Sequence, residues 1–244
     1  MSTDKILAGR IALVTGASRG IGKAAALGLA QAGAHVIATA RTQGGLEALD
    51  DEIFRATGEH ATLVPLDIRN GDGIDQLGGQ IHERWGKLDI LVSAAGDLGQ
   101  LTPTAHLDPR TFDRAVGVNL TANFRLIRSL EPLLRKAEAG RALFLTTGLA
   151  TEPRAFFTAY AASKAGLESL VRCWADEMAH TEVRATLLSP GPMRTRMRAA
   201  AFPGEDPMEL PAPEAIVPSV IELVRGDRDP PPFFRFEAEG AASA

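Results

Sequence analysis

The sequence has little cysteine, no long uninterrupted apolar run and no large excess of charge of one sign. Its one cysteine, Cys173, excludes an intrachain disulfide, suits a reducing compartment and is expected to be a small packing residue. No apolar run is long enough to cross a bilayer, and residues 1–9 lack the apolar core of a signal peptide. The net charge of −4 argues against non-specific nucleic-acid binding. We therefore expect a cytoplasmic protein with no membrane or nucleic-acid partner, and we expect no metal site.

What the sequence does contain is typical of one globular α/β domain. Its 244 residues, 45% hydrophobic and 23% charged, suffice for a single domain spanning 1–244. Short apolar runs alternate with segments of helical period. The expected strands are 11–14, 35–40, 61–66, 88–93, 141–146, 183–188 and 233–237; the expected helices are 23–32, 46–57, 73–85, one or two within 109–136, 160–181 and 214–225. This alternation predicts a parallel sheet with helices on both faces.

The segment IALVTGASRGIG at 11–22 is the part around which the other elements are arranged. A buried strand leads into a turn, a helix follows, and the turn contains Gly16, Gly20 and Gly22. The first N–H groups of such a helix lack intrahelical partners and favour an anion. Glycines let a pyrophosphate approach the backbone, while Ser18 offers a hydroxyl and Arg19 a positive charge. The glycine spacing is wider than the Gly-x-Gly-x-x-Gly dinucleotide fingerprint, so a turn that only joins a strand to a helix is the alternative.

Two positions bear on the choice of nucleotide. Arg41 directly follows the expected strand 35–40, where the adenosine ribose lies in folds of this kind. No acidic residue is there to repel a 2′-phosphate, and Arg41 with Arg19 places two cations near one spot, which favours NADP(H) over NAD(H). The alternative is that Arg41 is a solvated loop residue. Asp67, after the third strand, either accepts a hydrogen bond from the adenine amine or caps the next helix.

Two polar features of the expected helices carry the chemistry. Tyr160 and Lys164 are four residues apart, so their side chains lie on one helix face. A free phenol titrates near pH ~10, and a nearby ammonium lowers that pKa, which makes tyrosine a usable general acid or base. Asn119 falls on the apolar stripe of the segment 109–136. A buried amide there needs partners; the alternative is capping by its own helix backbone.

Taken in order, these features resemble the short-chain dehydrogenase/reductase family in its compact form, with its TGxxxGIG and YxxxK motifs. The resemblance is carried by TGASRGIG at 15–22, Ala94-Ala95-Gly96, Asn119, Thr146-Thr147, YAASK at 160–164 and Pro190-Gly191. It covers the chain from about Gly9 to Thr195. It implies a Rossmann-like, doubly wound α/β fold with a seven-stranded parallel sheet. It also implies reversible hydride transfer between a nicotinamide cofactor and a small-molecule carbonyl or secondary alcohol.

The resemblance assigns roles to residues of this sequence. Tyr160 gives or takes the hydroxyl proton, and Lys164 holds the nicotinamide ribose and lowers the Tyr160 pKa. Thr147 orients the substrate oxygen, and Asn119 holds a water of the proton relay. The residues that the resemblance assigns to cofactor binding are Gly16, Ser18, Arg19, Gly20, Ile21, Arg41, Asp67, Ile68, Ser93, Ala94, Ala95, Tyr160, Lys164, Pro190, Gly191, Met193 and Thr195.

The sequence departs from the family pattern in three places. Thr147 stands where serine is usual; it keeps the hydroxyl but adds a methyl that stiffens χ1 and narrows the pocket. Ser93 stands where asparagine is common, which alters one bond of the cofactor loop. The C-terminal tail lacks the Thr-Gly turn and terminal Asp-Gly that help form tetramers in the family. A homodimer through the helices that carry Asn119 and Tyr160 is therefore expected, with a homotetramer as the alternative.

A substrate lid is expected at about 193–212. Its apolar cover comes from Met193, Met197, Phe202 and Met208. Its cations, Arg194, Arg196 and Arg198, either bind an anionic substrate group or form a solvated face. Two functions remain open at this point: an NADP(H)-dependent oxidoreductase, and a non-catalytic NAD(P)-binding sensor or scaffold.

Overall fold

The computed structural model describes residues 5–237. Residues 1–4 of the N-terminal segment and residues 238–244 of the C-terminal tail lie outside the described residues. Seven strands form one all-parallel sheet in the order β3-β2-β1-β4-β5-β6-β7. They are β1 (Ile11–Thr15), β2 (His35–Ala40), β3 (Thr62–Pro65), β4 (Ile90–Ser93), β5 (Arg141–Leu145), β6 (Arg184–Ser189) and β7 (Phe233–Arg235). The predicted Rossmann-like, seven-stranded parallel sheet is confirmed.

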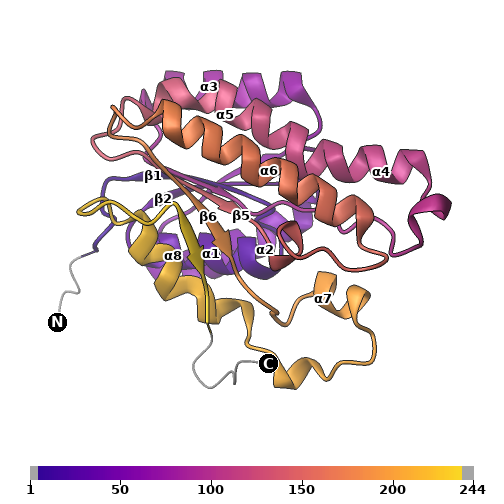
Figure 1. The fold of residues 1–244 in the computed structure, drawn as a ribbon. Coiled ribbons are helices and arrows are strands. Elements are labelled where there is room, and N and C mark those ends of the chain that lie inside the picture. Colours follow the sequence, from indigo (N-terminus) through magenta and orange to yellow (C-terminus); the bar gives the residue numbers. More distant parts are fainter. Residues whose placement is uncertain (1–4, 238–244) are drawn as a thin grey trace.

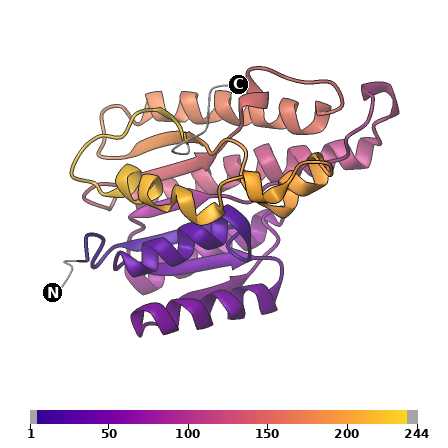
Figure 2. The same cartoon turned by 90° about the horizontal axis from the view of Figure 1, so that it is seen from below.

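Helices cover both faces of the sheet, as the two views in Figure 1 and Figure 2 show. One face carries α1 (Gly20–Gln31), α2 (Gln43–Thr57) and α8 (Val217–Val224); the other carries α3 (Gly71–Trp85), α4 (Pro109–Val116), α5 (Ala122–Leu134) and α6 (Thr158–Glu177). Every residue of β1, β4 and β5 is buried, because a parallel strand covered on both faces has no polar side. Two apolar clusters, one on each side of the sheet, form the core.

The strand order places the site. From β1 the chain runs outward through β2 to β3, and it then crosses back to lay β4 on the other side of β1. In open parallel sheets, ligands bind outside the carboxyl ends of the strands, where the order reverses in this way. The glycine turn after β1 and the Ala-Ala-Gly segment after β4 flank this point.

The segment between β4 and β5 differs in detail from the expected one or two long helices. α4 and α5 are separated by a π-helical turn, Gly117–Thr121, and Asn119 is its middle residue. Single π turns insert an extra residue into a helix and often mark functional sites. A second short helix, α7 (Arg196–Ala201), lies in the expected lid. Periodicity in the sequence gave neither feature.

The expectation that Cys173 packs in the interior is wrong. Cys173 is exposed, because α6 turns a different face inward, formed by Leu167, Val171 and Trp174. No helix within residues 5–237 combines the length and the apolar character that a membrane crossing requires.

Candidate active site

The turn after β1 has a backbone that only glycine satisfies. Gly16 has φ +68°, and a Cβ there would lie 2.8 Å from the Cα of Ala95. A Cβ on Gly22 would collide with the carbonyl oxygen of Gly16, and Gly20 also has positive φ, at +55°. The turn is therefore packed tightly against the segment after β4, and its bare backbone leads directly into α1, which begins at Gly20. These features fit a pyrophosphate at the helix N-terminus.

The side-chain hydroxyls of Thr15 and Ser93 hold the end of β4 and the segment after it in place. The Oγ1 of Thr15 accepts hydrogen bonds from the N–H groups of Ala94 and Ala95, at 3.1 and 3.2 Å. The hydroxyl of Ser93 is buried and donates to the Oδ1 of Asn123 on α5, at 2.6 Å. Ser93 thus belongs to the interior support of this loop rather than to its exposed surface.

Asp67 and Arg41 lie on the side of the crevice where adenine is expected. Both carboxylate oxygens of Asp67 accept from Arg69, with the shortest contact at 2.6 Å. This hydrogen bonding lowers the pKa of Asp67, and the more distant charge of exposed Arg41 adds to the effect. The N-cap of α3 is Asn70, whose side chain accepts from the N–H of Gly73. The alternative that Asp67 caps that helix is therefore wrong.

Four more residues that are expected to bind the cofactor are Ser18, Arg19, Ile21 and Ile68. Ser18 packs close to Gly45 near the start of α2, where a Cβ would lie 2.8 Å from the Cβ of Ser18. Arg19 is exposed at the N-cap position of α1 and makes no capping bond with its side chain. Ile68 is buried, and Ile21 packs partly buried against the core. Arg19 at the start of α1 and Arg41 directly after β2 are therefore both exposed.

Asn119 connects three separate segments. Its Oδ1 accepts from the N–H of Asp97 at 2.8 Å, and its Nδ2 donates to the carbonyl of Asp97 at 2.8 Å and to the Oγ of Ser163 at 2.9 Å. Asn119 is fully buried, so these bonds satisfy the amide that the sequence placed on an apolar stripe. The alternative of capping by its own helix is wrong. The side chain instead joins the segment after β4 to α6, which carries Tyr160 and Lys164.

Tyr160 and Lys164 both lie on α6, and burial moves their pKa values in opposite directions. Burial raises the pKa of the Tyr160 phenol to about 12. Burial lowers the pKa of the Lys164 ammonium to about 8, and the charge of Glu168 opposes this. The expectation that Lys164 lowers the Tyr160 pKa is therefore wrong for the chain by itself, because desolvation of the phenolate dominates. The ammonium donates to the carbonyl oxygen of Leu145, the last residue of β5, at 2.6 Å.

Thr147 follows β5 by two residues and has extended backbone. Its Oγ1 accepts from the N–H of Leu149 at 3.3 Å, which caps the 3₁₀ turn Gly148–Ala150. That bond uses only a lone pair, so the hydroxyl hydrogen is free to be donated. The adjacent Thr146 behaves differently: it is buried and donates to the Oε1 of Glu168, at 2.7 Å.

The segment expected to form the lid lies against the glycine turn after β1. Pro190 and Gly191 follow β6, Met193 is buried, and Thr195 caps α7 by accepting from the N–H of Arg198. The Cγ2 of Thr195 lies 3.5 Å from where a Cβ of Gly20 would be, and the Cε of Met197 lies 3.5 Å from that of Gly96. The lid therefore contacts both segments that flank the crevice.

The three arginines of the expected lid, Arg194, Arg196 and Arg198, differ in their surroundings. Arg198 forms a two-point ion pair with Glu205, at 2.6 Å for both bonds, and its guanidinium lies 3.8 Å from the ring centre of Phe202. Phe202 in turn stacks on buried Phe157, which precedes α6. Arg198 is thus part of the internal structure of the lid. Arg196 is exposed, and Arg194 lies against the sulfur of Met208.

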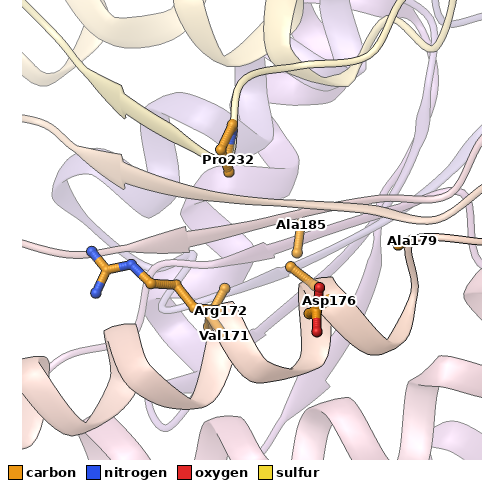
Figure 3. A pocket seen from close by; sticks show the side chains of 7 residues that line it. Val171, Arg172, Asp176, Ala179, Ala185 and Pro232 are labelled. Atoms are coloured by element: carbon orange, nitrogen blue, oxygen red, sulfur yellow. The ribbon is translucent and has the colours of Figure 1, made fainter.

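A pocket of about 300 Å³ lies elsewhere, beside α6 and β6 (Figure 3). It is lined by Val171, Arg172, Ala175, Asp176, Ala179, Ala185 and Pro232. None of the expected cofactor or catalytic residues lines it, so we place the candidate site in the crevice at the carboxyl ends of the strands. Within residues 5–237, no group of three or more His, Cys, Asp or Glu side chains could hold a metal ion.

Sequence reasoning missed three residues that support this crevice, Asp97, Ser163 and Glu168, and it did not predict the bond of Thr146 to Glu168. Each acts through a partner far away in the chain, and no local pattern marks it. Ser163 lies within the YAASK segment, but its bond to Asn119 depends on how α6 packs against the π turn.

Comparison with known proteins gives a consistent result. A family model described as short chain dehydrogenase matches residues 10–206. The oxidoreductase YciK of Escherichia coli K12, named as uncharacterized, is 37% identical over 224 residues, covering 91% of this chain and 88% of YciK. An NADPH-dependent pterin aldehyde reductase of Arabidopsis thaliana is 28% identical over 230 residues, covering 93% of each chain. A crystal structure of a short chain dehydrogenase from E. coli CFT073 complexed with NADPH superposes with a TM-score of 0.91 at 36% identity, covering 97% of this chain and 99% of that one.

Proposed function

The chain belongs to the short-chain dehydrogenase family of oxidoreductases, and from that premise we propose that it is an NADP(H)-dependent enzyme that interconverts a small-molecule carbonyl and a secondary alcohol. The observation that carries the proposal is the position of Tyr160 and Lys164 on α6. Lys164 bonds the end of β5, one residue before Thr146-Thr147, and Asn119 bonds the same helix through Ser163. Chemical groups from three segments thereby meet at the carboxyl edge of the sheet.

The residues at the crevice suit NADP(H). The turn from Gly16 to Gly20 would hold the pyrophosphate, since its backbone is bare and α1 begins there. Arg19 and Arg41 would bind the 2′-phosphate, and the absence of an acidic residue directly after β2 agrees with this. Asp67 and Ile68 would contact the adenine, while Pro190 to Thr195 would lie on the nicotinamide side. A related structure has NADPH bound, which supports the choice of cofactor.

The cofactor supplies or accepts the hydride when bound. In the reducing direction, the hydroxyl of Tyr160 donates its proton to the substrate oxygen as the new C–H bond forms. A phenol is protonated in the neutral range at its ordinary pKa, and burial raises the pKa of Tyr160 further, to about 12, so Tyr160 is in its donor form before the reaction begins. Thr147 donates a hydrogen bond to the same substrate oxygen, and Lys164 holds the nicotinamide ribose. Lys164 also favours the phenolate that remains after the proton has left.

The decisive experiment measures NADPH oxidation by the wild type and by Tyr160→Phe over a broad panel of aldehydes and ketones. We expect turnover of at least one compound by the wild type and a loss of about 1,000-fold in the variant, because proton transfer contributes 10²–10⁴-fold. NADPH affinity should be unchanged. NADPH binding without any Tyr160-dependent turnover would favour the sensor or scaffold.

Arg41→Ala tests the choice of cofactor. NADPH should bind the wild type more tightly than NADH does, and the variant should lose most of that preference, about tenfold or more, because a charge-assisted phosphate contact is lost. The matched control is exposed Arg55→Ala, in the last turn of α2 and so at the end of that helix away from Arg41. An unchanged preference in Arg41→Ala would show that another group selects the cofactor.

We further propose a cytoplasmic homodimer formed through α4, α5 and α6. Phe124 on α5 is 49% exposed, and a second copy packed on these helices would cover it. Light scattering coupled to gel filtration would give the mass. A dimer in the wild type that dissociates in Phe124→Glu supports this arrangement, and a monomer at every concentration excludes it.

A further inference from the structure

Glu168 is a buried carboxylate that the proposed mechanism does not use. It lies one helical turn beyond Lys164 on α6 and is 2% exposed. Its Oε1 accepts from the hydroxyl of Thr146 at 2.7 Å, and its Oε2 accepts from Arg172 at 2.6 Å. A buried carboxylate costs free energy unless its oxygens are well satisfied. Here both are, and the partners of Glu168 come from the strand that leads to Thr147 and from the helix that carries Tyr160.

The end of β5 is held to α6 at two successive helical turns. The carbonyl of Leu145 accepts from Lys164, and the hydroxyl of the next residue, Thr146, donates to Glu168. The residue after that is Thr147. The two bonds together fix both the translation and the rotation of the strand end relative to the helix. They therefore set the separation of the Thr147 hydroxyl from the Tyr160 phenol.

Glu168 also supplies a negative charge close to Lys164. Burial disfavours the ammonium, and the carboxylate of Glu168 favours it. The titratable and charged groups on the same helix as Lys164 are Tyr160 and Glu168, with Arg172 bonded to Glu168; the end of β5 contributes the carbonyl of Leu145 and the hydroxyl of Thr146. From the neighbouring segments, Asn119 of the π turn is bonded to α6 through Ser163, and Asp97, which is paired with Arg114, is bonded to Asn119. Of these, Glu168 is the carboxylate on the same helix face that has no other role in the site.

We propose that Glu168 is a positioning residue of this active site, which holds the end of β5 in register with α6 and places a negative charge one helical turn from the ammonium of Lys164. This inference rests on the proposed function, because Glu168 can position an active site only if Thr147, Tyr160 and Lys164 have the roles proposed above. Arg172 contributes from outside: it is largely exposed and extends away from Asp176 along α6, as Figure 3 shows. The guanidinium of Arg172 bonds Oε2 of Glu168 and covers this oxygen on the solvent side.

Three full-length variants separate the two parts of the role. Glu168→Gln removes the charge and keeps the shape, Thr146→Val removes the hydroxyl and keeps the charge, and Arg172→Met is the matched control that keeps both Glu168 and Thr146. Each is measured for NADPH affinity as a function of pH and, with any substrate found, for the pH profile of turnover. Thermal unfolding verifies that each variant folds.

We expect Glu168→Gln to shift the alkaline limb of NADPH binding to lower pH by about one unit, because Lys164 loses a nearby opposite charge. Thr146→Val should leave that limb in place and lower turnover about tenfold, since only the strand end is loosened. Arg172→Met should shift the limb to higher pH or leave it unchanged. The proposal is overturned if the alkaline limb of NADPH binding in Glu168→Gln coincides with that of the wild type. It is also overturned if Arg172→Met moves this limb to lower pH by the same amount.

The NADPH-binding arm does not need a substrate, so it distinguishes the two failures. If the wild type binds NADPH but shows no Tyr160-dependent turnover, the proposed function fails while the shift in Glu168→Gln still tests the effect on Lys164. If Glu168→Gln does not fold, Glu168→Asp takes its place. Aspartate keeps the charge but shortens the reach, so turnover should fall while the limb stays near that of the wild type. A limb displaced as far as one unit in Glu168→Asp would then reject the electrostatic part.

Discussion

Buried or half-buried cations lie at both edges of the sheet, and they are bonded in different ways. At the amino edge, Arg10 donates to the carbonyls of Asp89, Ala139, Val224 and Arg225, and Arg141 donates to those of Gly140, Glu182, Gly226 and Arg228. At the carboxyl edge, Lys164 makes one hydrogen bond within residues 5–237, to Leu145. An ammonium has three donors, so Lys164 keeps donor capacity for a ligand.

The difference shows how a buried charge can be assigned to structure or to function. Each guanidinium at the amino edge binds several carbonyls from separate segments and cannot give up its proton in the physiological range, although burial lowers the pKa of both Arg10 and Arg141. The ammonium at the carboxyl edge is sparsely bonded and has a pKa of about 8. The amino edge therefore holds the fold together, and the carboxyl edge is able to respond to ligand and to pH.

The largest expected effect is on stability at the amino edge. Arg10→Met should lower the free energy of unfolding by about 4 kcal/mol, because it removes the Arg10 donor from the part-buried carbonyls of Ala139, Val224 and Arg225, at about 1–3 kcal/mol each. Urea denaturation measures this, with the same substitution at exposed Arg55 on α2, Arg55→Met, as the control. NADPH affinity at low temperature should be unchanged. If Arg10→Met stays folded but binds NADPH more weakly, the amino edge also affects the ligand site, and the assignment of separate structural and ligand-binding roles to the two edges is wrong.

The second prediction concerns Tyr160, the one tyrosine of the chain. Phenolate absorbance therefore reports this residue alone, and the spectrum of Tyr160→Phe is subtracted to remove the absorbance of the two tryptophans. With a pKa of about 12, the folded protein should be about one-tenth ionised at pH ~11, against about nine-tenths in denaturant, where the pKa is near 10. A rapid pH jump gives the reading before unfolding. Equal ionisation in the two states would mean that burial does not control this phenol.

Much of the architecture follows from local sequence, and much of the site does not. β2 is found at His35–Ala40 as expected, and the glycine turn has the backbone that its residues suggest. These features depend on neighbours in the sequence. The bonds of Asn119 to Asp97 and of Glu168 to Thr146 join positions 22 residues apart. The first depends on how the π turn packs against the segment after β4, and the second on how α6 packs against the end of β5.

The same distinction explains the wrong expectations. Lys164 was expected to lower the Tyr160 pKa, since residues four apart on a helix are neighbours; spacing gives proximity but not burial, which dominates here. The position of Asp67 suggested a helix cap, but Asn70 three residues later is the cap. Local patterns thus locate a residue on the correct edge of the sheet, and only the packing decides what it bonds.

The third prediction tests the pH response of the carboxyl edge. The folded-state pKa of Lys164, about 8, is below its ordinary value of 10.5, so the unfolded chain binds more protons between these values. Stability should therefore rise with pH in this window. Relative to Lys164→Met, the wild type should gain about 2 kcal/mol between pH ~7.5 and pH ~9.5. Urea denaturation at both pH values measures it, and parallel pH dependences would show that burial of the ammonium carries no cost.

The smallest effect is expected at Thr147, where the question is whether a free hydroxyl or the methyl matters. Thr147→Ser keeps the donor and the lone pair that caps the turn at Leu149, and it removes only the group that restricts χ1. Turnover should stay within about threefold of the wild type, an energy below 1 kcal/mol. Thr147→Ala should lose about 100-fold, the usual effect of removing one donor to a developing oxyanion. An active alanine variant would show that Thr147, like the arginines of the amino edge, has only a structural role; a serine variant with tenfold lower turnover would show that the stiffness of threonine is needed to aim the hydroxyl.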